Sequence, residues 1–540
     1  MPVSYLSLDQ ISRLPGSVIP HLTAADIASL SVSQIGAINT SGIAILNATQ
    51  FSALSTTQVS GLSATQIPHF ASALAFDATQ LLVFSGQQFG ALTASQLDHF
   101  DSTRIAVIST TQMASMNGAA LSSLDETQIA LLTATQTSAL GVTAMKGLSA
   151  TDISEFSNAH VAAFSESQLG ALAAASFAAL DATKVGALTS TQIVGLTTTQ
   201  LSALSETDFA EFGSTQVIGF SATQLGAISA TNFSSLDATT VAALTTTQVK
   251  GLTTTQIAAL TETDIGELSG TQLDALAVFQ LKAMSATNFS ALDATQVGAL
   301  STTKIIGIST TQIAGLTTTD MAEFAATQIA KFHSGQIAAM SPNNFAVISG
   351  SLSPAQLGYA PAASISALTA TAFGGLTGTQ VQGLTATQIG ALALTDIGEF
   401  TSTQLGALLS TQIQAFGAAQ FSAFDATQIG GLTETHMGAM TFAQAGGLTV
   451  ADFAEFADTQ IGAIASTQIG NLATSIIDAL TATQIGGLTS TQISGFTETQ
   501  IDYLSTTSIG AMTPNQVEGF TVDQVNGMTS EQYIAYINAQ

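Results

Sequence analysis

The sequence predicts an all-α solenoid of about 66 short, capped helices, one for each repeat of eight residues. Three observations support this prediction. An eight-residue repeat fills the 540 residues of the chain. Each repeat contains the signal that starts an α-helix, and its apolar residues are spaced for a helix rather than for a strand.

The repeat, called the octad below, reads Leu, Ser or Thr, variable, Thr, Gln, Ile, variable, Ala or Gly, as in residues 252–259. Its Gln-Ile step keeps one register until two breaks, a shortened interval near residues 68–70 and four added residues within 349–352. These breaks delimit three predicted blocks: 1–69, 70–347, which carries a longer 56-residue repeat, and 348–540. Because the same octad runs through all three, we expect one continuous solenoid rather than separate globular domains.

The middle of the octad matches a helix capping box. A Ser or Thr such as Thr253 can accept a hydrogen bond from the third helical N–H, and Gln256 can reach back to the N–H of the cap. Leu252 and Ile257 stand where the two halves of a hydrophobic staple stand. Prolines follow the cap at Pro342, Pro354 and Pro514, in the first helical turn that tolerates proline. Each octad is therefore predicted to be one short helix.

A β-solenoid is the alternative, since Thr, Ile and Val are abundant. A strand would place its inward residues two apart, whereas the apolar pair of the octad lies three apart within a unit, from Ile257 to Leu260, and five apart across the cap. The period favours helices. A helix of six or seven residues does not hold alone in water, so the predicted stability comes from stacking octads on one another.

A longer period of seven octads places acidic residues at 56-residue intervals. In six octads Asp replaces the Gln and Glu follows three residues later; the pairs are Asp152/Glu155, Asp208/Glu211, Asp264/Glu267, Asp320/Glu323, Asp396/Glu399 and Asp452/Glu455. A second acidic series comprises Asp125, Asp181, Asp237 and Asp293. Two explanations stay open: a duplicated segment, or seven octads making a whole number of superhelical turns. Residues three apart share a helix face, so each Asp/Glu pair is a candidate for binding Ca²⁺ or for a lateral contact between subunits. The alternative is that Asp only substitutes for Gln near the helix N-terminus and that Glu faces solvent.

Composition excludes several classes of function. Eight Lys and Arg against 35 Asp and Glu, a net charge of −27, exclude a protein that follows nucleic-acid phosphates. No window is apolar enough for a membrane span. The chain has no cysteine, its six histidines are scattered, and its hydroxyl groups are predicted to cap helices, so no catalytic or cofactor-binding residue is predicted and we expect no enzyme.

The L-T-x-T-Q-I-x-A/G tandem resembles the repeat arrays of bacterial surface and secreted proteins. This resemblance covers the whole chain and implies an extracellular structural role as a filament, sheath or surface layer. An adhesin stalk or binding module, and an ice- or carbohydrate-binding threonine surface, are the alternatives. Residues 1–13 place no basic stretch before an apolar run, so export without a cleaved N-terminal signal is expected.

Self-association is the expected partnership. Residues 532–537 stay apolar rather than forming a polar terminal repeat, and solenoids with uncapped ends stack on one another. A homo-oligomer or polymer is therefore predicted, with glycans on exposed Ser and Thr rows as possible surface partners.

Overall fold

The computed structural model describes residues 2–71 and 75–540. These residues form 63 α-helices and four 3-10 helices, from α1 (Leu8–Ser12) to α63 (Ser530–Ala539), and contain no strand. The all-α prediction is confirmed and the β-solenoid alternative is excluded. Contacts group the chain into two compact units, Met1–Ala283 and Met284–Gln540, a division that falls at neither register break.

One octad shows how each helix forms. Helix α29 (Thr254–Ala259) begins after Thr253, whose N–H donates to Gln256 Oε1 at 2.8 Å and whose Oγ1 accepts the Gln256 N–H at 3.2 Å. The helix ends where Leu260 turns to an extended conformation. Both halves of the predicted capping box are therefore present, and most helices last only four to six residues because the next cap follows at once.

The glutamine also performs a second task. Gln256 Nε2 donates to the carbonyl oxygens of Leu225, at 2.8 Å, and Ile228, at 3.0 Å, which lie 31 and 28 residues earlier in the chain. Those carbonyls are at or just beyond the end of an earlier helix, where the helix itself supplies no N–H partner. The same pair of bonds recurs at glutamines such as Gln136, Gln200, Gln404 and Gln500. We call this series the glutamine ladder.

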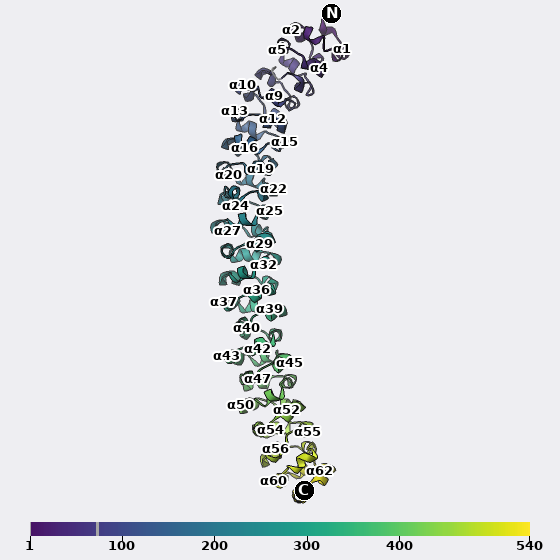
Figure 1. Cartoon of the computed structure of the whole chain (residues 1–540), viewed down its shortest axis with the longest axis vertical. Coiled ribbons are helices and arrows are strands. Elements are labelled where there is room, and N and C mark those ends of the chain that lie inside the picture. The colour runs from purple at the N-terminus through teal and green to yellow at the C-terminus, as the bar shows by residue number, and fades with distance from the viewer. Residues whose placement is uncertain (1, 72–74) are drawn as a thin grey trace. The chain divides into compact units, whose positions relative to one another are not determined.

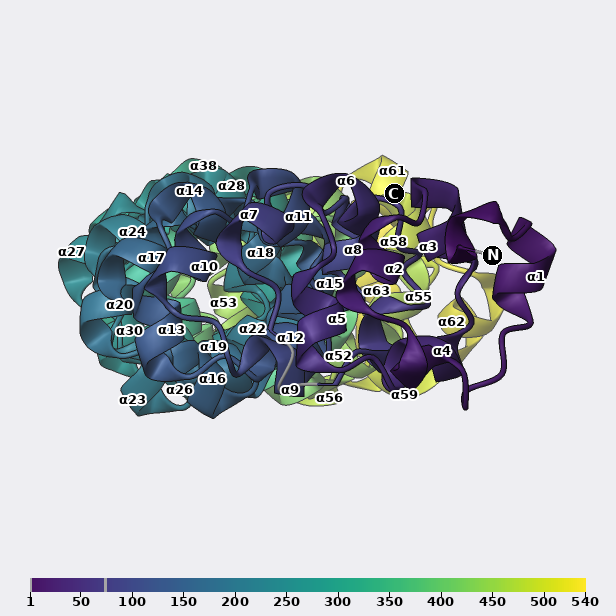
Figure 2. The ribbon, with the colours of Figure 1, turned by 90° about the horizontal axis from the view of Figure 1, so that it is seen from above.

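The ladder fixes the pitch of the superhelix. Helices three apart in sequence contact each other, as do α13 (Glu126–Ala130), α16 (Ala150–Glu155) and α19 (Ala174–Ala178), which follow one another along unit 1 (Figure 1). In the view from above, α13, α16 and α19 lie next to one another (Figure 2). A ladder bond of 28 residues spans three and a half octads, so we infer that one turn takes about 3.5 octads and that seven octads complete two turns.

The interior is built from the first and sixth residues of each octad. Leu252 and Ile257 are buried, as are their counterparts along the chain. Small residues let neighbouring turns approach: a Cβ on Gly251 would lie 2.1 Å from the Ala222 carbonyl oxygen, so only glycine fits there. Repeated apolar pairs and close backbones thus supply the packing that a six-residue helix needs.

The glutamine ladder continues across both register breaks, but its bonds span fewer residues there. After the first break the ladder bonds of Gln88 reach back 29 and 26 residues, two fewer than usual. After the second, those of Gln356 reach back 27 and 24 residues. There the added residues form the 3-10 helix η4 (Ser349–Ser351), directly after α40 (Pro342–Ile348). The stack of turns therefore continues across each break, with ladder bonds that span two residues fewer at the first break and four residues fewer at the second.

Candidate functional site

Six octads have Asp at the fifth position and Glu three residues later, and we call them the acid octads. Their aspartates act as capping residues. In α30 (Glu262–Glu267) the Thr261 N–H donates to Asp264 Oδ2 at 2.7 Å, and the Asp264 N–H donates to Thr261 Oγ1 at 3.2 Å. The other five aspartates accept the same N–H at 2.7 to 3.1 Å. One carboxylate oxygen thus takes the place of the glutamine Oε1.

The side chain of an aspartate has no N–H group with which to continue the glutamine ladder. Instead it accepts a hydrogen bond from a serine 30 residues earlier, as Ser234 Oγ donates to Asp264 Oδ2 at 2.7 Å. Four other acid octads have the same bond: Ser122 to Asp152, Ser290 to Asp320, Ser366 to Asp396 and Ser422 to Asp452. Asp208 is the exception, because Ala178 stands where the serine would be. The bond between turns is kept, but its direction is reversed.

The glutamate of each acid octad lies in a negative environment. Burial raises the pKa of Glu267, and the neighbouring charges of Asp264 and Asp237 raise it further. Asp237 caps α27 (Ala238–Ala243), one superhelical turn away. Like-charge neighbours favour the neutral form of a carboxyl group, so these glutamates hold their protons more tightly than an exposed glutamate does.

The same negative environment recurs at the other acid octads. It brings the Asp/Glu pairs close to the second acidic series, although the two are separate in the sequence. The pKa values of the other five glutamates are also raised, with burial as the largest cause, followed by the aspartate of the same octad: Glu155, Glu211, Glu323, Glu399 and Glu455. The second series contributes as well, since Asp125, Asp181 and Asp293 act on Glu155, Glu211 and Glu323. In unit 2, Glu323 Oε2 is buried and accepts no hydrogen bond. The structure therefore brings three carboxyl groups together at most acid octads.

The predicted Ca²⁺ ligands are thus placed close to one another, but each aspartate already accepts hydrogen bonds from the protein. In the part of the chain that the structure describes, no three acidic, histidine or cysteine side chains form a group suited to hold a metal ion. Calcium binding by the acid octads stays a prediction.

Two histidines have a role that their scattered positions did not suggest. His436 is buried and stands where the octad has glutamine; its Nδ1 accepts the Thr433 N–H at 3.2 Å, and its Nε2 lies 2.8 Å from the Leu408 carbonyl oxygen, 28 residues earlier. His160 makes the same two contacts. A neutral imidazole with its proton on Nε2 therefore replaces the glutamine amide. Their place at the fifth octad position was the signal that could have revealed this.

No helix among the described residues is both long and apolar enough to cross a lipid bilayer. Compared with protein-family models and with curated protein sequences, the chain matches none.

Proposed function

We propose that this chain is an extracellular structural protein that self-assembles into a filament, sheath or surface layer. One observation carries the proposal: the same packed octad, with its cap, ladder bond and buried apolar pair, recurs through both units. A repeated element presents one surface many times, so a weak contact made by one octad is multiplied along the chain.

The composition of that surface supports the same role. Charged residues are only 8% of the chain, and the exposed positions of the octad are mainly Ser, Thr, Ala and Gly. Short, neutral side chains lose little conformational entropy when two surfaces meet. Such a surface suits extended contacts between copies of the chain.

The alternatives remain open to experiment. An adhesin stalk or binding module would use a side of the superhelix on which variable residues gather. An ice- or carbohydrate-binding threonine surface has less support, because the described residues form helices and give the threonines no flat strand face.

The test is to follow the purified chain by sedimentation velocity and electron microscopy at increasing concentration, with and without Ca²⁺. We expect larger species and regular assemblies at high concentration. A chain that stays monomeric under all these conditions overturns the proposal, and glycan-array binding by that monomer would favour the binding-module alternative.

A further inference from the structure

A pocket opens in unit 1 where the glutamine ladder is interrupted. Thr240 stands at the fifth position of its octad, where glutamine usually stands, and it lines a pocket of about 420 Å³. Phe209, Phe212 and Val217 form apolar parts of the wall, and Glu206 and Asp237 contribute carboxylates. The pocket therefore combines an apolar lining with negative charge.

The pocket also contains backbone acceptors without a donor. Ladder glutamines donate to carbonyls 28, 30 or 31 residues earlier, which for Thr240 are those of Phe212, Ala210 and Phe209. Among the described residues, the carbonyl oxygens of Ala210 and Phe212 accept no hydrogen bond, whereas that of Phe209 accepts one from the Phe212 N–H. Carbonyl groups that have no ladder donor are free to accept a hydrogen bond from a group that enters the pocket.

The chain itself shows what fills this place. Lys184 stands 56 residues before Thr240, at the equivalent position of the longer repeat, and its side chain is buried. Its Nζ donates to the Ser154 carbonyl oxygen at 2.9 Å and lies 3.3 Å from Asp181 Oδ2. Ser154 corresponds to Ala210, and Asp181 corresponds to Asp237. An ammonium group is thus already accommodated by this arrangement.

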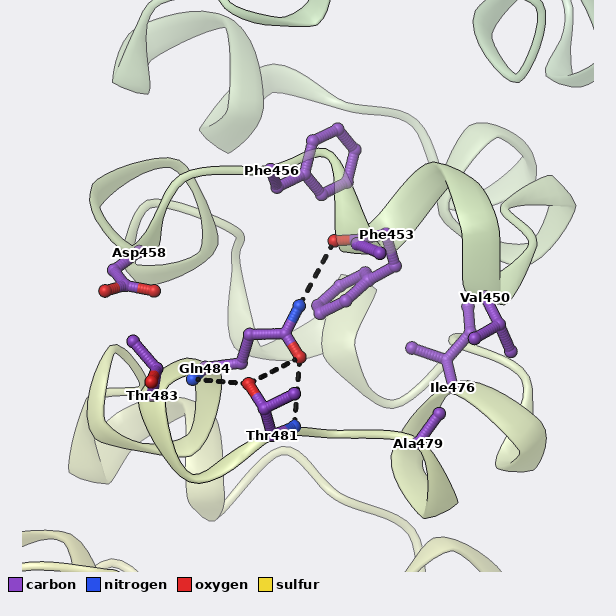
Figure 3. Close-up of a pocket in the computed structure, with 10 residues that line it drawn as sticks. Val450, Phe453, Phe456, Asp458, Ile476, Ala479, Thr481, Thr483 and Gln484 are labelled. Carbon is purple, nitrogen blue, oxygen red and sulfur yellow. Dashed lines mark hydrogen bonds between the residues drawn. The ribbon is translucent and has the colours of Figure 1, made fainter. Parts of the chain in front are cut away.

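A third copy of the pocket contains the side-chain amide of a ladder glutamine. Figure 3 shows the equivalent pocket of unit 2, where Gln484 replaces Thr240 and Phe453 and Phe456 replace the two phenylalanines. Gln484 Nε2 donates to the Phe453 carbonyl oxygen at 3.4 Å, and Gln484 Oε1 accepts the Thr481 N–H at 3.0 Å. Here a ladder N–H reaches the Phe453 carbonyl, the counterpart of the Phe209 carbonyl, whereas the Thr240 side chain has no N–H.

We propose that the Thr240 pocket binds a primary ammonium group on a short alkyl chain. The ammonium would donate to the carbonyl oxygens of Ala210 and Phe212 and pair with Asp237, as Lys184 does with Ser154 and Asp181. The alkyl chain would lie against the phenylalanines. Hydrogen bonds from the N–H groups of Thr240 and Thr239 lower the pKa of Asp237, which keeps this carboxylate charged. The site does not depend on self-assembly.

The test is a calorimetric titration of the full chain with pentylammonium at neutral pH, with pentanol as the neutral control. We expect one saturable site for pentylammonium and none for pentanol. Thr240→Lys places an ammonium in the pocket and should abolish binding. Asp237→Asn should weaken binding about tenfold or more, because a charge-assisted hydrogen bond is lost.

Two further variants separate the site from general damage to the fold. Thr240→Gln restores the ladder donor, so it should abolish binding while the chain melts at the same temperature or higher. Lys184→Thr recreates the Thr240 arrangement in the preceding long repeat, so the number of bound pentylammonium ions should rise to two. Absence of saturable binding to the original chain, or binding unchanged by Thr240→Lys, overturns the proposal.

The ammonium can belong to a free alkylamine or to a lysine side chain of another protein. A second titration therefore uses the peptide acetyl-Gly-Lys-Gly-amide. Binding of both probes, abolished by Thr240→Lys, supports a site that accepts protein lysines. Binding of pentylammonium alone supports a site for free amines.

Discussion

Two neighbouring octads, those of Gln256 and Asp264, differ in what joins them to the turn before. Their helices, α29 and α30, each have six residues and begin with the same threonine cap. Gln256 donates to two backbone carbonyls of the preceding turn. Asp264 accepts one hydrogen bond from Ser234 and adds a negative charge beside Glu267. An amide can cap one helix and bridge to another, whereas a carboxylate can only accept.

We expect the largest loss of stability when the hydrogen bonds of a ladder glutamine are removed. Gln256→Ala leaves the Thr253 N–H and the carbonyls of Leu225 and Ile228 without their partners in a buried place. Each unsatisfied buried group costs about 1–3 kcal/mol, so we expect a loss of about 3 kcal/mol or more from the local free energy of unfolding. Hydrogen exchange of the amides around residues 225–257 measures it.

Two other substitutions serve as controls. Gln256→Glu keeps the length and the acceptor but removes the donor, so it should destabilise almost as much as alanine does. Asp264→Gln supplies the ladder donor in an acid octad, and a gain of about 1 kcal/mol is expected there. If Gln256→Glu left hydrogen exchange unchanged, the ladder bonds would not be what holds successive turns together.

The helix starts could be predicted from the sequence, and the ladder could not. The cap formed by Thr253 and Gln256 involves residues three apart, so a local pattern is enough to identify it. The bond from Gln256 Nε2 to Ile228 depends on the pitch of the superhelix, which no single octad encodes. Only the 56-residue spacing of Asp152, Asp208 and Asp264 hinted at that pitch, since seven octads make two turns.

The candidate site was predicted in part for the same reason. Asp264 and Glu267 lie three apart on one helix, and their proximity follows from helix geometry. Ser234 and Asp237 reach them from 30 residues earlier, a relation that depends on how turns stack. The role of His436 was missed because a histidine resembles a glutamine only once both of its hydrogen-bond partners are known.

The stability of one ladder position is expected to depend on pH, because His436 stands there. Burial lowers the pKa of His436, although the hydrogen bond to the Leu408 carbonyl opposes this. The folded chain therefore resists protonation: the contribution of this residue to stability is present above the ordinary histidine pKa and is lost as the pH falls toward the lower, folded value. The doubly protonated ring cannot accept the Thr433 N–H, so we expect a local loss on the order of 1 kcal/mol.

Hydrogen exchange near residues 408–437 between pH 7 and pH 5 measures this effect. His436→Gln restores the common ladder residue and should remove this part of the pH dependence. The interpretation of His436 as a neutral substitute for glutamine is contradicted if His436→Gln and the original chain lose protection in parallel as the pH falls.

A smaller change in stability is expected when the charge of an acid octad is removed. The pKa of Glu323 is raised by burial and then by Asp320 and Asp293. A group with a raised folded pKa contributes stability below its unfolded pKa and loses that contribution as the pH rises through the folded value. Glu323→Gln should therefore stabilise the chain at pH 7 by less than about 1 kcal/mol, and this gain should vanish near pH 4.

The smallest expected effect is that of Ca²⁺, which would neutralise the same carboxylates. Millimolar Ca²⁺ should raise the melting temperature slightly, more than Mg²⁺ does, because Ca²⁺ accepts irregular sets of carboxylate and carbonyl oxygens. Thermal unfolding followed by circular dichroism measures the shift. The Asp320→Asn/Glu323→Gln double variant removes one acid octad and should reduce the shift, whereas its control Asp274→Asn, outside the acid octads, should leave it unchanged. An equal response to both ions, unaffected by either variant, would mean that the acid octads attract cations only through the net charge of −27.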